Sequence, residues 1–236
     1  MASEILKLRN PVWHSLTDKH QSFAIEFNGI KFYHPDYCPF GGWVAGADTA
    51  DGLDRYADLA HSFYIVGDKP KHSNKVKCVN ELVCHQMILD KPLDIRVDET
   101  ITTLDEDHGD ELFALVNKVQ PGYFRRMTSH LGSYFGIYKD GMLVAVTGER
   151  MKMDSFTEIS AVVTHPAYTG RGYARQLITH TAHMIRSEHN IPYLHVAGSN
   201  THAITLYEKL GFTLIRKLSL WKFALNSEMA DLPSHQ

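Results

Sequence analysis

The sequence predicts an α+β fold in which a C-terminal mixed central sheet, flanked by helices, follows a smaller α+β N-terminal domain. Three observations lead to this prediction. Runs rich in Val, Ile and aromatic residues, typical of strands, alternate with stretches whose apolar residues recur at helical spacing. Asn28-Gly29 and Asp140-Gly141 each separate two such runs, as in β-hairpins. A glycine-rich turn around Gly172 joins a strand to a helix.

Two domains are expected. The chain has 236 residues, of which 44% are apolar and 22% charged, and this composition fits one large globular domain or two small ones. The segment "DKPLDIRVDET", around Pro92, is the best candidate for a boundary, so we expect an N-terminal α+β domain at 1–97 and a second domain at 98–226. Residues 227–236 are expected to form a frayed tail. No internal repeat is visible.

The charge and the hydropathy of the chain argue against two classes of partner. The formal net charge is -3, so the protein lacks the positive field that would hold nucleic acid or anionic lipid. The first residues, "MASEILKLRNPVWH", lack the apolar core of a signal peptide, and no apolar run is long enough to span a membrane. We therefore expect a cytoplasmic protein that binds neither nucleic acid nor a membrane.

The cysteines and histidines predict no metal and no disulfide framework. The three cysteines are odd in number and form no CxxC pair, so reduced thiols are expected. His180 with His183, or Cys84 with His85, could start a metal site, but no third and fourth ligand stands at a suitable spacing. Surface or packed histidines are the simpler interpretation.

The N-terminal part is expected to contain a hairpin, a helix and one or two further strands. Residues 22–34 have apolar residues on both sides of Asn28-Gly29, and residues 51–63 have a helical pattern. Residues 75–89, rich in Val, Leu and Ile, predict one strand or two. The aromatic and glycine cluster at 37–44 either lines a ligand pocket or forms a packed loop.

From Ile101 the order of elements becomes regular. A short strand at 101–104 is followed by Asp105, placed as a helix N-cap, and the spacing predicts helices over 110–119 and 124–131. A hairpin over 135–150 and a strand that ends at Pro166 come next.

The elements after the glycine-rich turn are a helix, a strand, a second helix and a last strand. Apolar residues recur at helical spacing to about His189. A strand at 192–197 leads to a helix over 201–210, with Asn200 as its cap and Gly211 at its end. Residues 212–225 predict the last strand of the sheet.

The turn "GRGYAR" has the parts of a phosphate-binding cradle, because free N–H groups and the dipole of the following helix favour an anion. Spacing excludes two ligands. A dinucleotide site requires a small third residue, and Arg175 stands at that position. No G-x-x-x-x-G-K-S/T segment exists, so a nucleoside triphosphate loop is excluded as well.

Two distant segments, "VVTHPAYTGRGYA" and "NTHAITLYEKLGF", together resemble the motifs of the GNAT superfamily of acyl-CoA N-acyltransferases. In the first, Gly172 and Ala174 occupy the family's small positions, whereas Thr169 replaces the usual Gln or Arg. The second follows the family's N-x-x-A-x-x-x-Y-x-x-x-G-F. The resemblance covers roughly residues 101–225 and implies a GNAT acyltransferase domain.

The resemblance implies acetyl-CoA as cosubstrate and no metal. In the family, backbone groups of the strand that ends before the glycine turn bind pantetheine, which here implies Val162, Val163 and Thr164. The glycine turn binds the pyrophosphate, to which Arg171 could add a charge-assisted contact. Asn200 is a helix cap, a ligand of the cofactor, or both. The cofactor-binding residues implied in this way are Val162, Val163, Thr164, Thr169, Gly170, Arg171, Gly172, Tyr173, Ala174, Arg175 and Asn200.

Glu158 and Tyr207 are the candidate catalytic residues. An amine of pKa ~10 is mostly protonated at neutral pH, so a base must free its lone pair before it can attack. Glu158 stands where some family members carry a catalytic glutamate, on the face expected to be shared by residues 158, 160, 162 and 164. Alternatively it is solvated or pairs with an arginine. Tyr207 matches the family's tyrosine and could protonate the departing thiolate, or it is a buried structural residue.

The acyl acceptor is not specified by the sequence. A small-molecule amine or an amino acid is favoured, and a protein amine is a further option. Arg125 and Arg126 could hold an acceptor carboxylate, although two basic residues on a solvated helix are the simpler interpretation. We predict an N-acetyltransferase that works by direct attack of a primary amine. The alternative is a noncatalytic CoA-binding or regulatory module whose N-terminal domain senses a ligand or partner.

Overall fold

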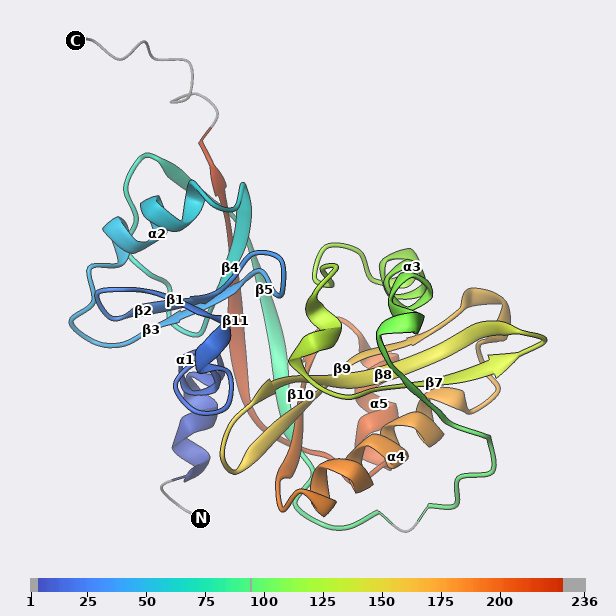
Figure 1. The fold of residues 1–236 in the computed structure, drawn as a ribbon. Coiled ribbons are helices and arrows are strands. Elements are labelled where there is room, and N and C mark those ends of the chain that lie inside the picture. The colour runs from blue at the N-terminus through green and yellow to red at the C-terminus, as the bar shows by residue number, and fades with distance from the viewer. Residues whose placement is uncertain (1–3, 94, 227–236) are drawn as a thin grey trace, which may run out of the picture.

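The computed structural model describes residues 4–93 and 95–226, which build one mixed sheet with helices on its faces (Figure 1). The sheet has 11 strands in the order β1-β2-β3-β4-β11-β5-β10-β9-β8-β7-β6. Its size and its flanking helices confirm the predicted α+β class. The expected tail at 227–236 lies outside the described residues.

The N-terminal elements alternate between short helices and strands. They are, in chain order, the 3₁₀ helix η1 (Glu4–Arg9), α1 (Pro11–Ser15), the 3₁₀ helix η2 (Gln21–Phe23), β1 (Ala24–Phe27), β2 (Ile30–Tyr33), β3 (Phe40–Trp43), α2 (Thr49–Ala57), β4 (Ser62–Val66) and β5 (Val76–Ile88).

The predicted N-terminal hairpin and strand are confirmed, whereas the helix predicted over 51–63 ends at Ala57, and its last two residues belong to β4. Asn28 and Gly29 have φ values of 42° and 90°, which is the left-handed backbone that a two-residue hairpin turn requires. Asp48 caps α2 by accepting a hydrogen bond from the backbone N–H of Asp51. The apolar run at 75–89 forms the single strand β5.

The C-terminal elements follow the predicted order. They are β6 (Thr102–Leu104), the 3₁₀ helix η3 (Glu106–His108), α3 (Gly109–Val119), the 3₁₀ helix η4 (Thr128–Leu131), β7 (Tyr134–Lys139), β8 (Met142–Lys152), β9 (Phe156–Thr164), the 3₁₀ helix η5 (Pro166–Tyr168), α4 (Tyr173–Ser187), β10 (Ile191–Ala197), α5 (Thr201–Lys209) and β11 (Thr213–Leu225).

One predicted helix in this part is much shorter than expected. The sequence predicted a helix over 124–131, but only η4 forms there. The Thr128 hydroxyl accepts a hydrogen bond from the backbone N–H of Arg125 and donates one to the carbonyl of Tyr37. These side-chain bonds hold the backbone in a turn, in competition with a helix. Asn200 caps α5 as predicted, whereas Asp105 caps η3, the 3₁₀ turn that leads into α3, instead of α3 itself.

The N-terminal and C-terminal parts of the chain share the sheet. The long strands β5 and β11 lie next to each other at its centre, β11 pairs with β4, and β5 pairs with β10 (Figure 1). Helix α3 covers one face of β7–β9, and α4 and α5 cover the other face (Figure 1). The division into domains at residue 97 stays a prediction.

Candidate functional site

Two neighbouring strands separate in the C-terminal half of the sheet. Strands β9 and β10 are parallel, but they pair only between Phe156–Glu158 and Ile191–Tyr193. On its other edge β10 pairs with β5 from Tyr193, opposite Ile88, to Ala197, opposite Cys84. The edge of β9 that faces β10 is therefore unpaired from Ile159 onward, and its backbone groups are available to a ligand.

An irregularity in β9 lies next to this separation. The ladder between β8 and β9 shifts its register after Ser160, where Ala161 has a left-handed φ of 51°. Such a bulge turns the following side chains and ends a simple alternation. The predicted shared face of Glu158, Ser160, Val162 and Thr164 is therefore wrong beyond Ser160.

A cavity of about 450 Å³ opens where the strands part. Strands β9 and β10 line it together with α5, with α3 and the loop after it, and with strands of the N-terminal part. Phe40, in the aromatic and glycine cluster at 37–44, is one of the lining residues, and Phe40–Trp43 form the strand β3 rather than a loop. That this cluster binds a ligand stays a prediction. Both candidate catalytic residues, Glu158 and Tyr207, line the same cavity.

The Glu158 carboxylate is buried and has several hydrogen-bond donors around it. Its side chain is 1% exposed. Arg150 on β8 donates from Nε to Oε2 and from a terminal nitrogen to Oε1, each at 2.8 Å. His195 Nδ1 lies 2.7 Å from the same Oε1. The alternative pairing with an arginine is therefore present in the structure.

These partners set the ionisation of Glu158. Burial pushes the pKa of Glu158 upward, but the charge and hydrogen bonds of Arg150, together with the hydrogen bond of His195, hold that pKa well below its usual range. Glu158 is thus ionised at neutral pH. Because a carboxylate with so low a pKa is a weak base, its predicted role stays a prediction, and the acceptor would have to displace a donor from one oxygen first.

The His195 ring connects Glu158 to the N-terminal part of the chain. The Gln86 side-chain nitrogen lies 2.9 Å from His195 Nε2 and also 2.9 Å from the backbone carbonyl of Leu8. The amide nitrogen of Gln86 carries two protons and can donate to both groups. His195 Nε2 is then an acceptor, so a neutral His195 carries its proton on Nδ1, which faces Glu158. A chain of hydrogen bonds therefore runs from Arg150 to Leu8.

Tyr207 lies on α5, one turn after Ala203, and its side chain is 7% exposed. Burial raises its pKa to about 12, so the phenol keeps its proton at neutral pH. No described residue makes a hydrogen bond to its hydroxyl. Asn200 lines the same cavity while its Oδ1 accepts from the backbone N–H of Ala203, so its role as a cap is established and its role as a ligand stays a prediction.

The glycine-rich turn opens the start of α4. Gly170 and Gly172 have φ values of 76° and 78°, and Gly172 is the N-cap of the helix without a side-chain hydrogen bond. The first backbone N–H groups of a helix have no partner within it, so this turn and helix start can receive an anion. Thr169, Gly170, Arg171, Gly172 and Arg175 are exposed, and the turn lies outside the lining of the cavity.

Gly172→Val is expected to weaken CoA binding about 10-fold or more, because a β-branched side chain disfavours left-handed backbone and fills the space that a phosphate needs. A Cβ at Gly172 would meet no atom of the protein within 4 Å, so the fold should survive. Gly46→Val is the matched control, since Gly46 has a φ of 89° and equally open surroundings. Calorimetry that gives both folded variants the same CoA affinity would remove this turn from the site.

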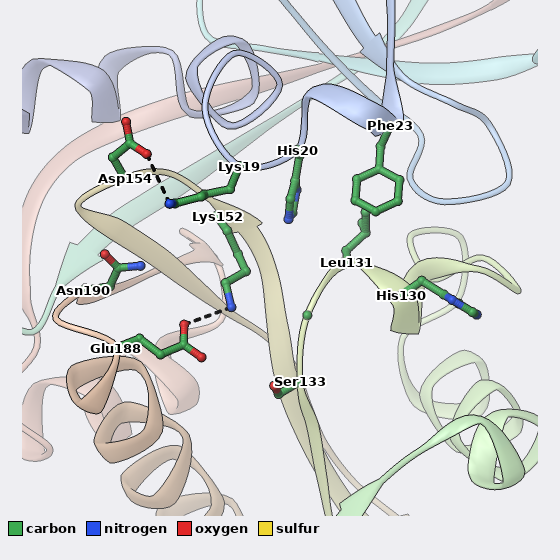
Figure 2. A pocket seen from close by; sticks show the side chains of 11 residues that line it. Lys19, His20, Phe23, His130, Leu131, Ser133, Lys152, Asp154, Glu188 and Asn190 are labelled. Carbon is green, nitrogen blue, oxygen red and sulfur yellow. Dashed lines mark hydrogen bonds and ion pairs between the residues drawn. The ribbon is translucent and has the colours of Figure 1, made fainter.

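A second cavity, of about 580 Å³, lies between the loop before η2, the turn between β8 and β9 and the end of α4 (Figure 2). Its charged groups bind one another. Lys152 Nζ lies 3.1 Å from a carboxylate oxygen of Glu188, and Lys19 Nζ lies 3.6 Å from one of Asp154 (Figure 2). The parted strands, the unpaired edge and the candidate catalytic residues all belong to the cavity between β9 and β10, which we take as the functional site.

Other expectations concern metals, membranes and thiols. Over 4–93 and 95–226, no group of three or more His, Cys, Asp or Glu side chains is arranged to hold a metal ion. Within the same ranges, no helix has both the length and the apolar character needed to cross a membrane. Cys38, Cys78 and Cys84 are free thiols.

Three polar residues of the site were missed in the sequence, and two suggested residues lie elsewhere. Arg150 and Glu158 lie on the antiparallel neighbours β8 and β9, but at a register shift that the sequence pattern does not specify. Nothing in the sequence marks His195 or Gln86. Arg125 and Arg126, suggested for an acceptor carboxylate, are not among the lining residues, and Arg126 pairs with Asp110.

Comparisons with known proteins agree with this geometry. The family model for FR47-like proteins matches residues 134–221. A GNAT-family acetyltransferase from Novosphingobium aromaticivorans is 30% identical, with a TM-score of 0.85 over 93% of this chain and 99% of that one. A GCN5-related N-acetyltransferase-like protein from Streptococcus suis has the same fold at 13% identity, with a TM-score of 0.61 over 95% and 98%. No curated protein matches the chain significantly.

A GCN5-related N-acetyltransferase from Kribbella flavida is also similar in fold, at 13% identity and a TM-score of 0.58 over 92% of this chain and 96% of that one. The mixed sheet, the parted strands and the glycine-rich helix start define an acyl-CoA N-acyltransferase. The chain belongs to the GNAT family of acetyltransferases.

Proposed function

We propose that the protein transfers an acetyl group from acetyl-CoA to a primary amine by direct attack, with Glu158 as base and Tyr207 as acid. One observation carries this proposal: the separation of β9 from β10 joins both candidate residues and an unpaired strand edge in one cavity. A linear pantetheine arm needs such an edge, because its amide groups require hydrogen-bond partners when they leave water.

The residues implied by the family resemblance suit acetyl-CoA. Val162, Val163 and Thr164 lie on β9 beyond its last pairing with β10, so their backbone groups on that edge can bind pantetheine. The exposed turn at 169–172 and the uncapped start of α4 can hold the pyrophosphate, with Arg171 as an added charge. Tyr173 is buried and anchors this start of the helix.

The two candidate catalytic residues differ in how well their surroundings suit them. Tyr207 keeps its proton at neutral pH and its hydroxyl is not engaged by the described residues, so it has a proton to donate to the thiolate of CoA as the carbon–sulfur bond breaks. Burial also makes the phenol a weaker acid, because its pKa of about 12 lies above the ~8.5 of a thiol, so this transfer is uphill and relies on the hydrogen bond to the developing thiolate. Glu158 must first exchange the hydrogen bond of Arg150 or His195 for one from the acceptor's ammonium group. The proton that leaves the amine can then move through the carboxylate to solvent.

Release of free thiol from acetyl-CoA in the presence of amines tests the proposal. We expect release that depends on the amine and forms one acetylated amine for each thiol, as measured by mass spectrometry. A panel of small amines, amino acids and a peptide with a free N-terminus covers the acceptor classes. A protein that binds acetyl-CoA in calorimetry but releases no thiol with any member of the panel would contradict the proposal.

A further inference from the structure

Five strands of the first half, β1 to β5, have counterparts in β7 to β11 of the second half, whereas β6 and α5 have none. In the first half β1, β2 and β3 are antiparallel, and α2 leads to β4, which is parallel to β3. In the second half β7, β8 and β9 are antiparallel, and α4 leads to β10, which is parallel to β9. The last strand of each half, β5 or β11, has crossed to the other half and pairs with β10 or β4.

This arrangement indicates two copies of one fold with exchanged last strands, a repeat that was not visible in the sequence. The helix starts of the two copies differ. Gly172 leaves the start of α4 open, whereas the Asp48 carboxylate occupies the start of α2 and Asp51 adds a charge in the first turn. Two carboxylates repel a phosphate. The first half is therefore unsuited to hold a second CoA.

The exchange instead brings the N-terminal half into the cavity of the C-terminal half. Phe40 from β3 and Leu82 from β5 line that cavity. The Phe40 ring lies 4.7 Å from the guanidinium carbon of Arg150, the partner of Glu158, and 6.2 Å from the ring of Tyr123. Phe40, Leu82 and Tyr123 form an apolar wall beside Glu158 and Arg150. Because Glu158 lies six residues before Thr164 on β9, this wall lies at the end of the strand that is away from the proposed phosphate site.

The charges in the cavity limit what the acceptor can carry. Among the described lining residues, Arg150 and Glu158 are the only Lys, Arg, Asp or Glu side chains, and they bind each other. A second charged group on the acceptor would lose its hydration without gaining an unpaired counter-charge. An apolar or aromatic body would instead displace water from the wall formed by Phe40, Leu82 and Tyr123.

From these contacts we infer that the N-terminal half determines the acceptor, and that the acceptor is a small primary amine with an uncharged apolar or aromatic body. This inference rests on the proposed acetyl transfer. It assigns the N-terminal half a binding role in the active site of the C-terminal half.

Leu82→Trp tests the inference, because an indole ring is larger than the leucine side chain and narrows the cavity at the wall. We expect kcat/KM for phenethylamine to fall about 10-fold or more, and that for methylamine to change less than about 3-fold. Val83→Trp is the matched control: Val83 is the next residue of β5, points to the opposite face by alternation and is 42% exposed. Val83→Trp should leave kcat/KM unchanged for both phenethylamine and methylamine.

The wild-type enzyme supplies a second readout. Phenethylamine should be a better acceptor than phenylalanine by about 10-fold or more, because phenylalanine adds a carboxylate to the same ring. Equal use of the two acceptors, or an equal loss for both amines in Leu82→Trp, would overturn the inference. If no amine is acetylated, calorimetry of phenethylamine with the protein–CoA complex decides. If phenethylamine binds and Leu82→Trp weakens that binding, the inference is supported although the proposed function fails. If phenethylamine does not bind, the inference is overturned.

Discussion

Glu158→Gln is expected to lower the turnover number by about 10² to 10⁴-fold near neutral pH while leaving CoA affinity nearly unchanged. The amide keeps the shape of the side chain but cannot accept a proton as a carboxylate does. Turnover at saturating acetyl-CoA and amine, together with calorimetry of CoA, measures the two quantities. Wild-type turnover in the folded variant would contradict the role of base.

This variant has a second effect that must be separated from catalysis. Arg150 would lose the carboxylate that compensates its charge, and breaking a buried ion pair in this way typically costs about 3–5 kcal/mol. The double variant Arg150→Met with Glu158→Gln removes both charges and should recover much of the melting temperature. If Glu158 is the base, the double variant stays slow. Recovery of both stability and turnover would show that Glu158 only balances Arg150.

Tyr207→Phe is expected to lower turnover about 10²-fold or more with little change in the melting temperature. Phenylalanine keeps the buried ring and its packing against Phe212, and the lost hydroxyl has no hydrogen bond within 4–93 or 95–226. Thermal unfolding and steady-state kinetics are the measurements. A lower melting temperature with unchanged turnover would identify Tyr207 as a packing residue.

The identity of the leaving group sharpens the test of Tyr207. If the phenol protonates the thiolate, the loss in Tyr207→Phe should be smaller with an acetyl donor whose thiol has a lower pKa, because that thiolate needs less assistance. Equal losses with both donors would exclude the role of acid. Tyr134→Phe is the matched control, since Tyr134 is 1% exposed, does not line the cavity and has a buried hydroxyl to which none of the described residues bonds. Its turnover should remain that of the wild type.

Local sequence signals predicted most of the fold of this protein. The turns at Asn28-Gly29 and Asp140-Gly141 adopt the left-handed backbone that these residue types tolerate. Helix α4 forms where the apolar residues after Gly172 recur at helical spacing, and Asn200 caps the next helix, α5. The helix predicted over 124–131 did not form in full, because the Thr128 side chain bonds to backbone groups in competition with the helix.

The sequence by itself determined the α+β class, the order of most elements, the glycine-rich helix start and the motif that contains Tyr207, because each depends on residues close together in the chain. Only the tertiary structure decided the partners of Glu158, the bulge at Ala161 and the exchange of β5 and β11. Gln86 and His195 touch across two strands that are far apart in sequence. Such contacts depend on strand order and register, which side-chain patterns within one strand do not specify.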